Sequence, residues 1–316
     1  MTNQEIVDDW FARHLEAQGV LALTGMRGTG KSKALERFAL WHRGHCRSGE
    51  DVLLIHCESR LLRHIRTGEE LWTYVCSRTT SGPLHLFIDE ASSFRDIGHF
   101  FELVFSSGRC TTVCIACSNS RVLADVPDGV MVHECRLLPD GTHMRSAIQL
   151  DRLWDALFLR DVLNGLHLVD VQAIEHVAEW VIDHMGESAS LRRIGMDLAS
   201  MGCRLSHNTV GSYLDSLQSS YLVERVPCWD VFEQVESKTD YSFFCMDLEL
   251  RRYRRGPTPE LNMTNLVRAL AYIDLRRAHG RVCSVKNGPE GADFVTSPGK
   301  GPVFWHAGPN GATPML

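Results

Sequence analysis

One segment, residues 20–32, indicates the fold class of this chain. It reads Val-Leu-Ala-Leu-Thr-Gly-Met-Arg-Gly-Thr-Gly-Lys-Ser. Residues 20–23 form a short apolar run that predicts a buried strand, and a glycine-rich turn follows it. Residues 25–32 fit the pattern Gly-x-x-x-x-Gly-Lys-Ser, and a helix is predicted directly after it over 31–42. In this setting the glycines let backbone N–H groups point inward at phosphate oxygens, and the helix adds its positive N-terminal end. The stretch therefore predicts a loop that binds a nucleoside triphosphate, the alternative being a glycine-rich turn that holds nothing.

Two side chains of this loop supply the chemistry of phosphate and metal binding. We expect Lys31 to contact the β- and γ-phosphates and the Ser32 hydroxyl to bind magnesium. The predicted nucleotide-binding residues are Gly25, Arg27, Gly28, Thr29, Gly30, Lys31, Ser32 and Lys33.

Two carboxylates at the end of a second apolar run supply the acids that such a site needs. Residues 85–90 read His-Leu-Phe-Ile-Asp-Glu. We expect Asp89 to hold magnesium and its water shell together with Ser32, and Glu90 to act as the general base that polarises a water. The alternative is a pair of acids that cap the following helix.

A third strand-like run, residues 112–117, ends in the polar residues Ser118 and Asn119. In P-loop ATPases, a polar residue at the tip of the strand beside the acidic one often hydrogen-bonds the attacking water or the γ-phosphate. Ser118 and Asn119 therefore join Lys31 and Glu90 as the predicted catalytic residues. An ordinary turn rich in serine and asparagine explains this segment equally well.

Strands and helices alternate over the first 145 residues. Strands are predicted at 20–23, 51–57, 84–88 and 111–117, and helices over 2–18, 31–42, 61–75 and 97–105. Because such an alternation produces right-handed crossovers, the sequence predicts an α/β fold in which a parallel sheet has helices on both faces.

After about residue 145 this alternation stops. Two helices are predicted over 150–185, and a helix-turn-helix with two following strands over 188–246. Ser206 is the expected N-cap of the second helix of that pair, and strands at 222–226 and 241–245 are expected to form a β-wing. The tail predicts a helix over 262–279 and strands near Val282 and Phe294.

The composition is that of an ordinary globular chain without a strong electrostatic field. The 316 residues are 44% apolar and 23% charged with a net charge of -6, so no global basic surface attracts nucleic acid or membranes. The N-terminal segment carries acids where a signal peptide carries basic residues, and no apolar run reaches the roughly eighteen residues of a membrane span. We therefore expect a cytoplasmic protein that makes no membrane contact.

The eleven cysteines do not predict a metal site. Cys114 and Cys117 form a C-x-x-C pair, but like Cys57 they lie in apolar, strand-like runs, where a thiol behaves as a small hydrophobic group. Neither a second pair nor a matched histidine spacing follows.

With these residues in place, the sequence resembles the prokaryotic AAA-type predicted ATPases that end in a restriction-endonuclease-like domain. The resemblance covers most of the chain and rests on segments in the family's order: residues 25–32, Leu-Phe-Ile-Asp-Glu-Ala-Ser-Ser-Phe at 86–94, Ala-Cys-Ser-Asn-Ser at 116–120, Leu-Trp-Asp-Ala-Leu at 153–157 and the winged-helix-like region 184–226. It implies a P-loop NTPase core of the AAA-like type, with ATP and Mg²⁺ as its ligands. It also implies four domains: the ATPase core 1–145, a helical lid or connector 146–187, a winged-helix domain 188–255 and a small degenerate α/β nuclease-like domain 256–316.

The chain departs from this family where charge on the transferring phosphate matters. The family has a Gly-Arg pair shortly after the Ser-Asn segment, whereas this chain reads Asp128-Gly129-Val130 there. An arginine on the transferring phosphate is worth about 10³–10⁵ in rate. Arg136 and Arg160 are the candidates to replace it. The stretch 138–150 is also short relative to the family, which trims the lid.

The tail lacks most of the acids and the lysine that a metal-dependent nuclease of this type uses. Thr264 stands where the resemblance places a glutamate, and Asp293 remains. The following strand, residues 303–306, offers neither the second acid nor the lysine. One carboxylate does not assemble a nuclease site, so we expect the tail to be inactive.

The predicted function is a Mg-ATP-binding, AAA-type ATPase that uses hydrolysis to drive or gate its interaction with a partner. The alternative is a nucleotide-gated regulatory module that binds ATP with little hydrolysis. The sequence leaves turnover, base preference, a protein partner and an oligomeric state open.

Association with DNA is a third interpretation, and its basis is narrow. The helix at 206–219 offers His207, Asn208 and Gln218 for base contacts but no lysine or arginine, and an arginine cluster lies at 251–255. Packing or protein contact is therefore favoured for the winged helix, and a solvated helix face explains the arginine cluster equally well.

Overall fold

The computed structural model describes residues 2–139, 144–163, 170–256, 263–297 and 301–315. The chain divides into two compact units, Met1–His143 (unit 1) and Met144–Leu316 (unit 2), and each is described by itself. Within the described residues no helix combines the length and the apolar character that crossing a bilayer requires.

Unit 1 contains a five-stranded, wholly parallel sheet in the order β2-β3-β4-β1-β5. Its strands are β1 Val20–Thr24, β2 Asp51–His56, β3 Leu84–Asp89, β4 Cys110–Cys117 and β5 Val132–Arg136. The predicted α/β fold with a parallel sheet is confirmed, and four strands lie where the sequence placed them. The fifth strand was not predicted, because an edge strand reading Val-His-Glu-Cys-Arg is mostly polar and only Cys135 in it is buried.

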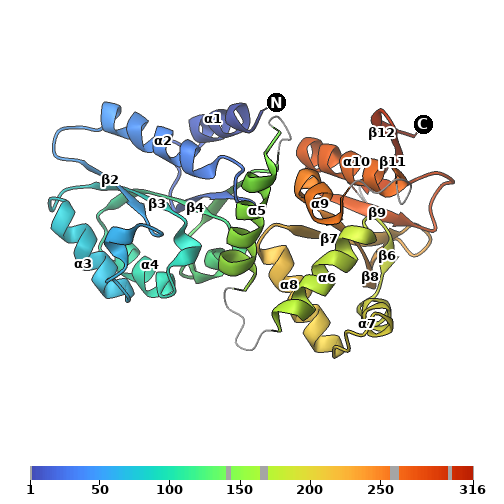
Figure 1. The fold of residues 1–316 in the computed structure, drawn as a ribbon. Coiled ribbons are helices and arrows are strands. Elements are labelled where there is room, and N and C mark those ends of the chain that lie inside the picture. The colour runs from blue at the N-terminus through green and yellow to red at the C-terminus, as the bar shows by residue number, and fades with distance from the viewer. Residues whose placement is uncertain (1, 140–143, 164–169, 257–262, 298–300, 316) are drawn as a thin grey trace. The chain divides into compact units, whose positions relative to one another are not determined.

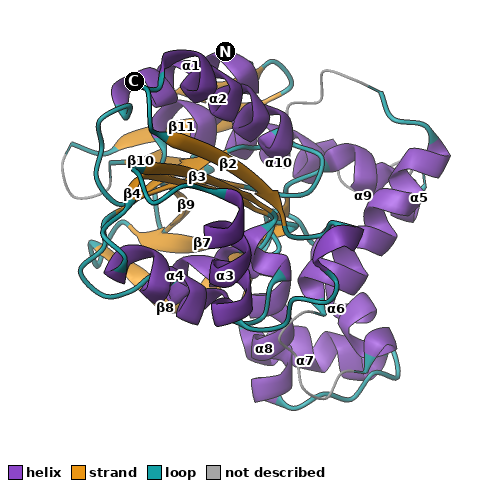
Figure 2. Cartoon of the chain, turned by 90° about the vertical axis from the view of Figure 1, so that its left-hand side faces the viewer, coloured by secondary structure: helices purple, strands orange, loops and turns teal. Residues whose placement is uncertain are grey.

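Helices cover both faces of this sheet, as expected (Figures 1 and 2). The helices are α1 Asn3–Arg13, α2 Lys31–His45, α3 Gly68–Arg78 and α4 Ile97–Ser106, with short 3₁₀ turns η1 Arg60–Leu62, η2 Ala91–Ser93 and η3 Ser120–Asp125. On one face α1 and α2 pack on apolar side chains such as Leu21, Leu23 and Phe87. On the other face α3 and α4 pack on the alternate strand residues, among them Leu86 and Ile88.

The prediction of a helix over 61–75 is wrong about where that helix begins. The chain makes the 3₁₀ turn η1 first, and α3 begins only at Gly68. Thr67 sets this start, because its side chain accepts from the backbone N–H of Glu70 while the Glu70 carboxylate accepts from the N–H of Thr67.

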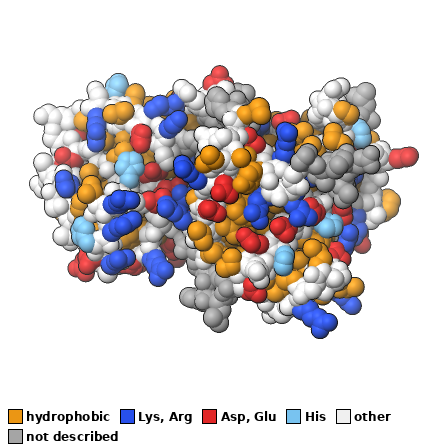
Figure 3. All heavy atoms as spheres, in the orientation of Figure 1, with side chains coloured by type: hydrophobic (Ala, Val, Ile, Leu, Met, Phe, Trp, Pro, Cys, Tyr) orange, Lys and Arg blue, Asp and Glu red, His pale blue; other side chains and the backbone are white. Residues whose placement is uncertain are grey.

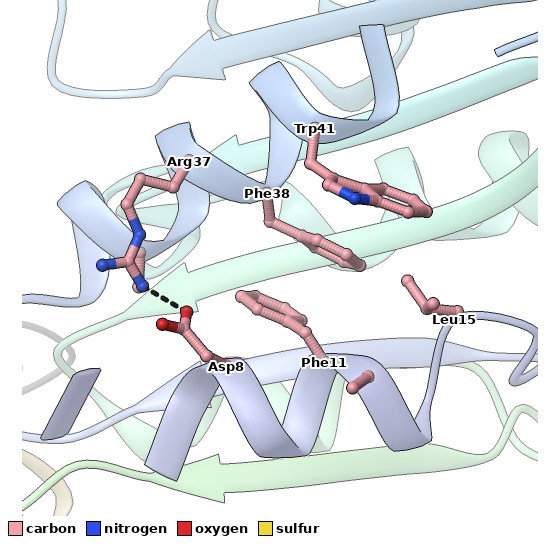
Figure 4. Close-up of a pocket in the computed structure, with 8 residues that line it drawn as sticks. Asp8, Phe11, Leu15, Arg37, Phe38 and Trp41 are labelled. Carbon is pink, nitrogen blue, oxygen red and sulfur yellow. Dashed lines mark hydrogen bonds and ion pairs between the residues drawn. The ribbon is translucent and has the colours of Figure 1, made fainter. Parts of the chain in front are cut away.

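Aromatic side chains join α1 to α2. The rings of Phe11 and Phe38 stack with centroids 3.6 Å apart, and the Arg37 guanidinium pairs with Asp8 at 2.5 Å. A groove of about 330 Å³ lies between the two helices, and the apolar side chains of Leu15 and Trp41 line it as well (Figure 4). None of the predicted phosphate-site residues lines this groove, so it is separate from the candidate site below.

The described residues of unit 2 form seven helical segments and a mixed sheet. The helices are α5 Ala147–Ala156, the π-helical segment η4 Leu157–Val162, α6 Val171–Asp183, α7 Leu191–Ser200, α8 His207–Ser219, α9 Leu248–Arg255 and α10 Met263–His279. The strands are β6 Ser188–Ala189, β7 Val223–Asp230, β8 Val235–Cys245, β9 Val282–Lys286, β10 Phe294–Thr296, β11 Val303–Gly308 and β12 Gly311–Pro314.

These strands form one sheet in the order β12-β11-β10-β9-β7-β8-β6. The strands predicted at 222–226 and 241–245 lie within β7 and β8, which pair antiparallel, and Ser206 caps α8 by accepting from the Thr209 backbone N–H. The pair of β7 with β9 is parallel, and it joins β7 and β8 to the strands β9 to β12 of the tail. The segments 188–255 and 256–316 therefore share a sheet.

The structure also places the cysteines of the apolar runs and the arginine cluster at 251–255. Cys114 and Cys117 are buried in β4, whereas Cys57 follows β2 and is partly exposed. In the arginine cluster, Arg255 pairs with Asp183 and Arg254 lies 3.6 Å from Glu179.

Candidate functional site

The segment between β1 and α2 forms a tight loop that depends on glycine. Gly25, Gly28 and Gly30 have φ values of 133°, 83° and 95°, in the region that residues with a side chain rarely adopt. A Cβ atom on Gly25 would lie 2.2 Å from the Leu137 carbonyl oxygen. Thr29 closes the loop by donating from Oγ1 to the Met26 carbonyl at 2.9 Å. The loop is thus a curled backbone directly at the N-terminus of α2.

Lys31 lies inside this curl. Its side chain is buried, and Nζ donates to the carbonyl oxygens of Gly25 at 2.8 Å and Met26 at 2.9 Å. A buried ammonium group costs free energy unless strong acceptors surround it, and phosphate oxygens are stronger acceptors than carbonyls. The position of Lys31 is therefore suited to an anion held by the loop. Lys33, two residues further along α2, is exposed.

The two predicted metal-binding residues are in contact. Ser32 Oγ donates to Asp89 Oδ1 at 2.9 Å, and Asp89, the last residue of β3, is only 8% exposed. The second carboxylate oxygen of Asp89 lies 3.1 Å from His56 Nδ1. A hydroxyl and a carboxylate placed together are the oxygen ligands that Mg²⁺ takes.

Glu90 is held from two sides. Its Oε2 accepts from Ser118 Oγ at 2.8 Å, and its Oε1 lies 3.6 Å from Arg27 NH1. The same guanidinium donates from NH2 to Glu58 Oε1 at 2.7 Å. Glu90 itself has a φ of 50°, a strained value for a residue with a side chain. The candidate base, the strand-end serine and the loop arginine thus form one cluster.

Asn119 makes a contact of a different kind. It is buried, and its Oδ1 accepts from the Arg121 backbone N–H at 3.0 Å, which caps the turn η3. This is the capping contact of a polar strand-to-helix turn, the alternative that the sequence left open for this segment. Ser118 differs because its hydroxyl reaches Glu90.

The strand order explains why these residues meet. The carboxyl ends of parallel strands lie at one edge of a sheet, and ligands bind there in open α/β sheets. Strand β4 lies between β1 and β3, so Ser118 stands between the loop and the two acids. Strand β2 pairs with β3 in the register His56 to Asp89, which brings His56 and Glu58 to the same edge.

His56 and Glu58 are the residues that the sequence prediction missed. His56 lies near the end of the strand predicted at 51–57, and Glu58 directly follows that strand, within His-Cys-Glu at 56–58. These polar residues at a strand end were the signal available in the sequence. They belong to the site because β2 lies beside β3 in the sheet, which the sequence does not reveal.

The two arginines considered as replacements lie in different units. Arg136 ends β5 opposite Thr24, the residue before the loop, and so lies at the same sheet edge. Arg160 is exposed on η4 in unit 2. The Asp128-Gly129-Val130 segment precedes β5.

The acid that remains in the tail has local partners. Asp293 Oδ1 accepts from Arg268 Nε at 2.7 Å, and Oδ2 accepts from the Ala307 backbone N–H at 2.8 Å. Thr264 is exposed on α10. Among the described residues no group of three or more His, Cys, Asp or Glu side chains is placed to hold a metal ion by itself.

Residues 17–132 match the family model of the AAA domain. This range contains the loop, both carboxylates and Ser118, so the part of unit 1 that holds the candidate site is similar to AAA domains. A protein of unassigned function from Haemophilus influenzae is 25% identical over 146 residues, which are 46% of this chain and 36% of that protein. The match thus spans about a third of the length of that relative.

Three solved structures are similar over larger shares of the chain. The Walker-type ATPase PABY2304 of Pyrococcus abyssi is 14% identical with a TM-score of 0.46, and the match covers 81% of this chain and 96% of that one. Drosophila ORC bound to AT-rich DNA and Cdc6 is 9% identical with a TM-score of 0.26, covering 81% and 94%. PCH-2 of C. elegans is 12% identical with a TM-score of 0.26, covering 68% and 65%.

Proposed function

We propose that unit 1 binds Mg-ATP at the loop Gly25–Ser32 and hydrolyses it with Glu90 as the base. The observation that carries this proposal is the 2.9 Å hydrogen bond between Ser32 Oγ and Asp89 Oδ1, beside the buried Lys31 ammonium. These groups come from two separate stretches of sequence, and each has the type that Mg-triphosphate binding needs. The AAA-type match over residues 17–132 supports the same assignment, and the choice of adenine rests on it.

The residues fit the two ligands in distinct ways. Lys31 and the loop N–H groups would hold the phosphates, with Arg27, Gly28, Thr29 and Gly30 shaping the loop around them. Ser32 and Asp89 would hold magnesium, which supplies charge neutralisation to the triphosphate. Glu90 would accept a proton from water, and Ser118 fixes the orientation of its carboxylate through the 2.8 Å bond.

A nucleotide-gated module with little hydrolysis is the second candidate, and one observation favours it. Both oxygens of Glu90 already face a partner, Ser118 on one side and Arg27 on the other. A general base must reach the water that it deprotonates, and these two contacts compete with that water for the carboxylate oxygens. In this case ATP binding itself would change the affinity for a partner.

Unit 2 would then carry the partner contact. Helices α7 and α8 followed by the antiparallel β7 and β8 support a winged-helix region over 188–255, preceded by a connector over 146–187 and followed by a nuclease-like tail without activity. Exposed His207, Asn208 and Gln218 on α8 give little positive charge for DNA. Basic and acidic side chains are interspersed on the face shown in Figure 3. We therefore propose contact with a protein, and association with DNA or with further copies of the chain as alternatives.

Two variants and one control test the proposal. Lys31→Ala should weaken ATP binding by at least about a hundredfold, since a charge-assisted contact is lost inside the loop. Arg43→Ala removes an exposed cation from the last turn of the same helix α2, away from the loop, and should bind as the wild type does. Equal ATP binding by the wild type and Lys31→Ala would overturn the assignment of the loop.

Turnover separates the two candidates. With saturating Mg-ATP, Glu90→Gln should bind normally and lose phosphate release by about a hundredfold or more, as expected for a general base. If the wild type releases phosphate as slowly as Glu90→Gln while both bind ATP, the gated module is the correct function.

A further inference from the structure

Unit 2 contains a cavity of about 460 Å³, and none of the residues of the proposed nucleotide site lines it. Its residues come from β6 to β10, the turn before β6, α7 and α10, all within unit 2. Cavities that hold small molecules have volumes of about 300–1,000 Å³. The cavity therefore has the size of a ligand site.

Small polar side chains on adjacent strands form the floor of this cavity. They are Ser284 on β9, Cys228 on β7, Ser242 on β8 and Ser188 on β6. Cys228 faces Ser284 in register, and the pairing of β7 with β8 shifts between Pro227 and Trp229, which flank Cys228. Such irregularities redirect a side chain and are frequent beside functional sites.

The floor is a hydrogen-bonded chain. Ser242 Oγ donates to Ser284 Oγ at 3.1 Å, Cys228 Sγ lies 3.0 Å from Ser284 Oγ, and Ser188 Oγ lies 3.5 Å from Cys228 Sγ. Next to it the core is filled by large rings, for example Phe244 stacked on Tyr272 at 4.5 Å. A hydroxyl both donates and accepts, so this floor can bind hydroxyl groups of a ligand, which apolar side chains cannot do.

The rim carries three cations and two carboxylates: Arg193, Arg268, Lys286, Glu187 and Asp293. Arg193 is occupied, because NH1 donates to the Ser188 carbonyl and NH2 to Glu187. Arg268 bonds Asp293 through Nε alone, and its terminal nitrogens have no hydrogen bond to the described residues. Lys286 donates one of its three hydrogens, to Asp240.

The available donors favour a phosphate group. The terminal nitrogens of arginine bind two phosphate oxygens at once, and a lysine ammonium can bind a third. Gly186 stands against the aliphatic part of the Arg268 side chain, where a Cβ would lie 3.3 Å from Cδ, so this arginine is held at the cavity.

We propose that this cavity binds a phosphorylated sugar, with the phosphate between Arg268 and Lys286 and the sugar hydroxyls on the Ser188, Ser242 and Ser284 floor. The proposal is independent of the nucleotide site in unit 1. It gives unit 2 a small-molecule ligand of its own, in place of nuclease chemistry around Asp293.

The test is calorimetric titration of the full chain with ribose 5-phosphate, ribose and inorganic phosphate. We expect ribose 5-phosphate to bind at least tenfold more tightly than either part alone, because both ends of the cavity contribute. The Lys31→Ala variant should bind it as the wild type does. Loss of binding in Lys31→Ala would place the ligand at the loop in unit 1 and overturn the proposal, as would no detectable binding at millimolar concentration.

Variants of the rim locate the ligand. Lys286→Met and Arg268→Gln should each weaken binding about tenfold or more, the value of one charge-assisted contact. Lys238→Met, an exposed lysine of the same sheet, is the matched control and should bind normally. Arg268→Gln removes the ion pair of Arg268 with Asp293, so thermal melting is used to check that this variant is folded. The side chain of Lys286 is 47% exposed, so Lys286→Met should leave the fold intact. Unchanged affinity in Lys286→Met would refute the site.

Discussion

The cluster of Arg27, Glu58 and Glu90 makes a quantitative prediction about ATP affinity. Arg27 contacts Glu58 at 2.7 Å and Glu90 at 3.6 Å, and its side chain is only 13% exposed. In Arg27→Ala, two carboxylates that shared one cation would face each other beside the triphosphate. A hydrogen bond to a charged group is worth about 1.5–3 kcal/mol, so the affinity for Mg-ATP should fall by about ten- to a hundredfold.

A double-mutant cycle with Glu58→Gln isolates this effect. Glu58→Gln removes one of the two negative charges and keeps the shape of the side chain, so Arg27→Ala should cost less in its presence. We expect a coupling energy of about 1–2 kcal/mol between the two positions, measured by titration with a fluorescent ATP analogue. Arg27→Lys keeps the charge but not the two-pronged contact with Glu58, and should lie between the wild type and Arg27→Ala. Additive effects of Arg27→Ala and Glu58→Gln would refute the reasoning, since they would show that the two side chains act separately.

Three further predictions concern the loop, the metal and the pH dependence of folding. Gly25→Ala should lower the free energy of unfolding by about 1–3 kcal/mol, because its Cβ would lie 2.2 Å from the Leu137 carbonyl oxygen at a φ of 133°; urea unfolding measures this. Asp89→Asn should reduce ATP affinity in magnesium to the value that the wild type shows with EDTA, and a magnesium-dependent gain in the variant would contradict the assignment. Burial, helped by His85 and His45, lowers the pKa of His42 from 6.5 to about 4, so the folded chain binds fewer protons than the unfolded chain between these values and its stability should fall as the pH drops from 6.5 towards 4. His42→Phe should flatten this loss in unfolding experiments at pH 7 and 5, and an equally steep loss in the variant would exclude His42 as its source.

The sequence predicted those parts of the site that depend on local pattern. The loop at 25–32 and the acids at 89–90 are each short, contiguous and bounded by an apolar run, so their place at a strand end follows from neighbouring residues alone. The break before α3 was also encoded locally, in Thr67 and Glu70, but the apolar spacing over 61–75 concealed it.

The remaining parts depend on which strands become neighbours. Glu58 joins the site only because β2 pairs with β3, and no spacing in the sequence gives that pairing. Strand β5 was not predicted because its sequence is polar and it is stabilised by parallel pairing with β1. In the sequence, Arg254 and Arg255 form a basic cluster. In the structure they lie against Glu179 and Asp183, because α9 packs beside α6.

The charge of the site explains why binding should depend on magnesium. Glu58, Asp89 and Glu90 bring three negative charges to the sheet edge, and Arg27, Lys31 and Arg136 bring three positive ones. A triphosphate adds several more negative charges at the same place, and Arg27 is already shared between Glu58 and Glu90. The charge of Arg27 is thus already compensated within the protein. The charge that remains to be neutralised therefore falls to a divalent cation at Ser32 and Asp89, and without that cation the acids of this edge would repel the nucleotide that Lys31 attracts.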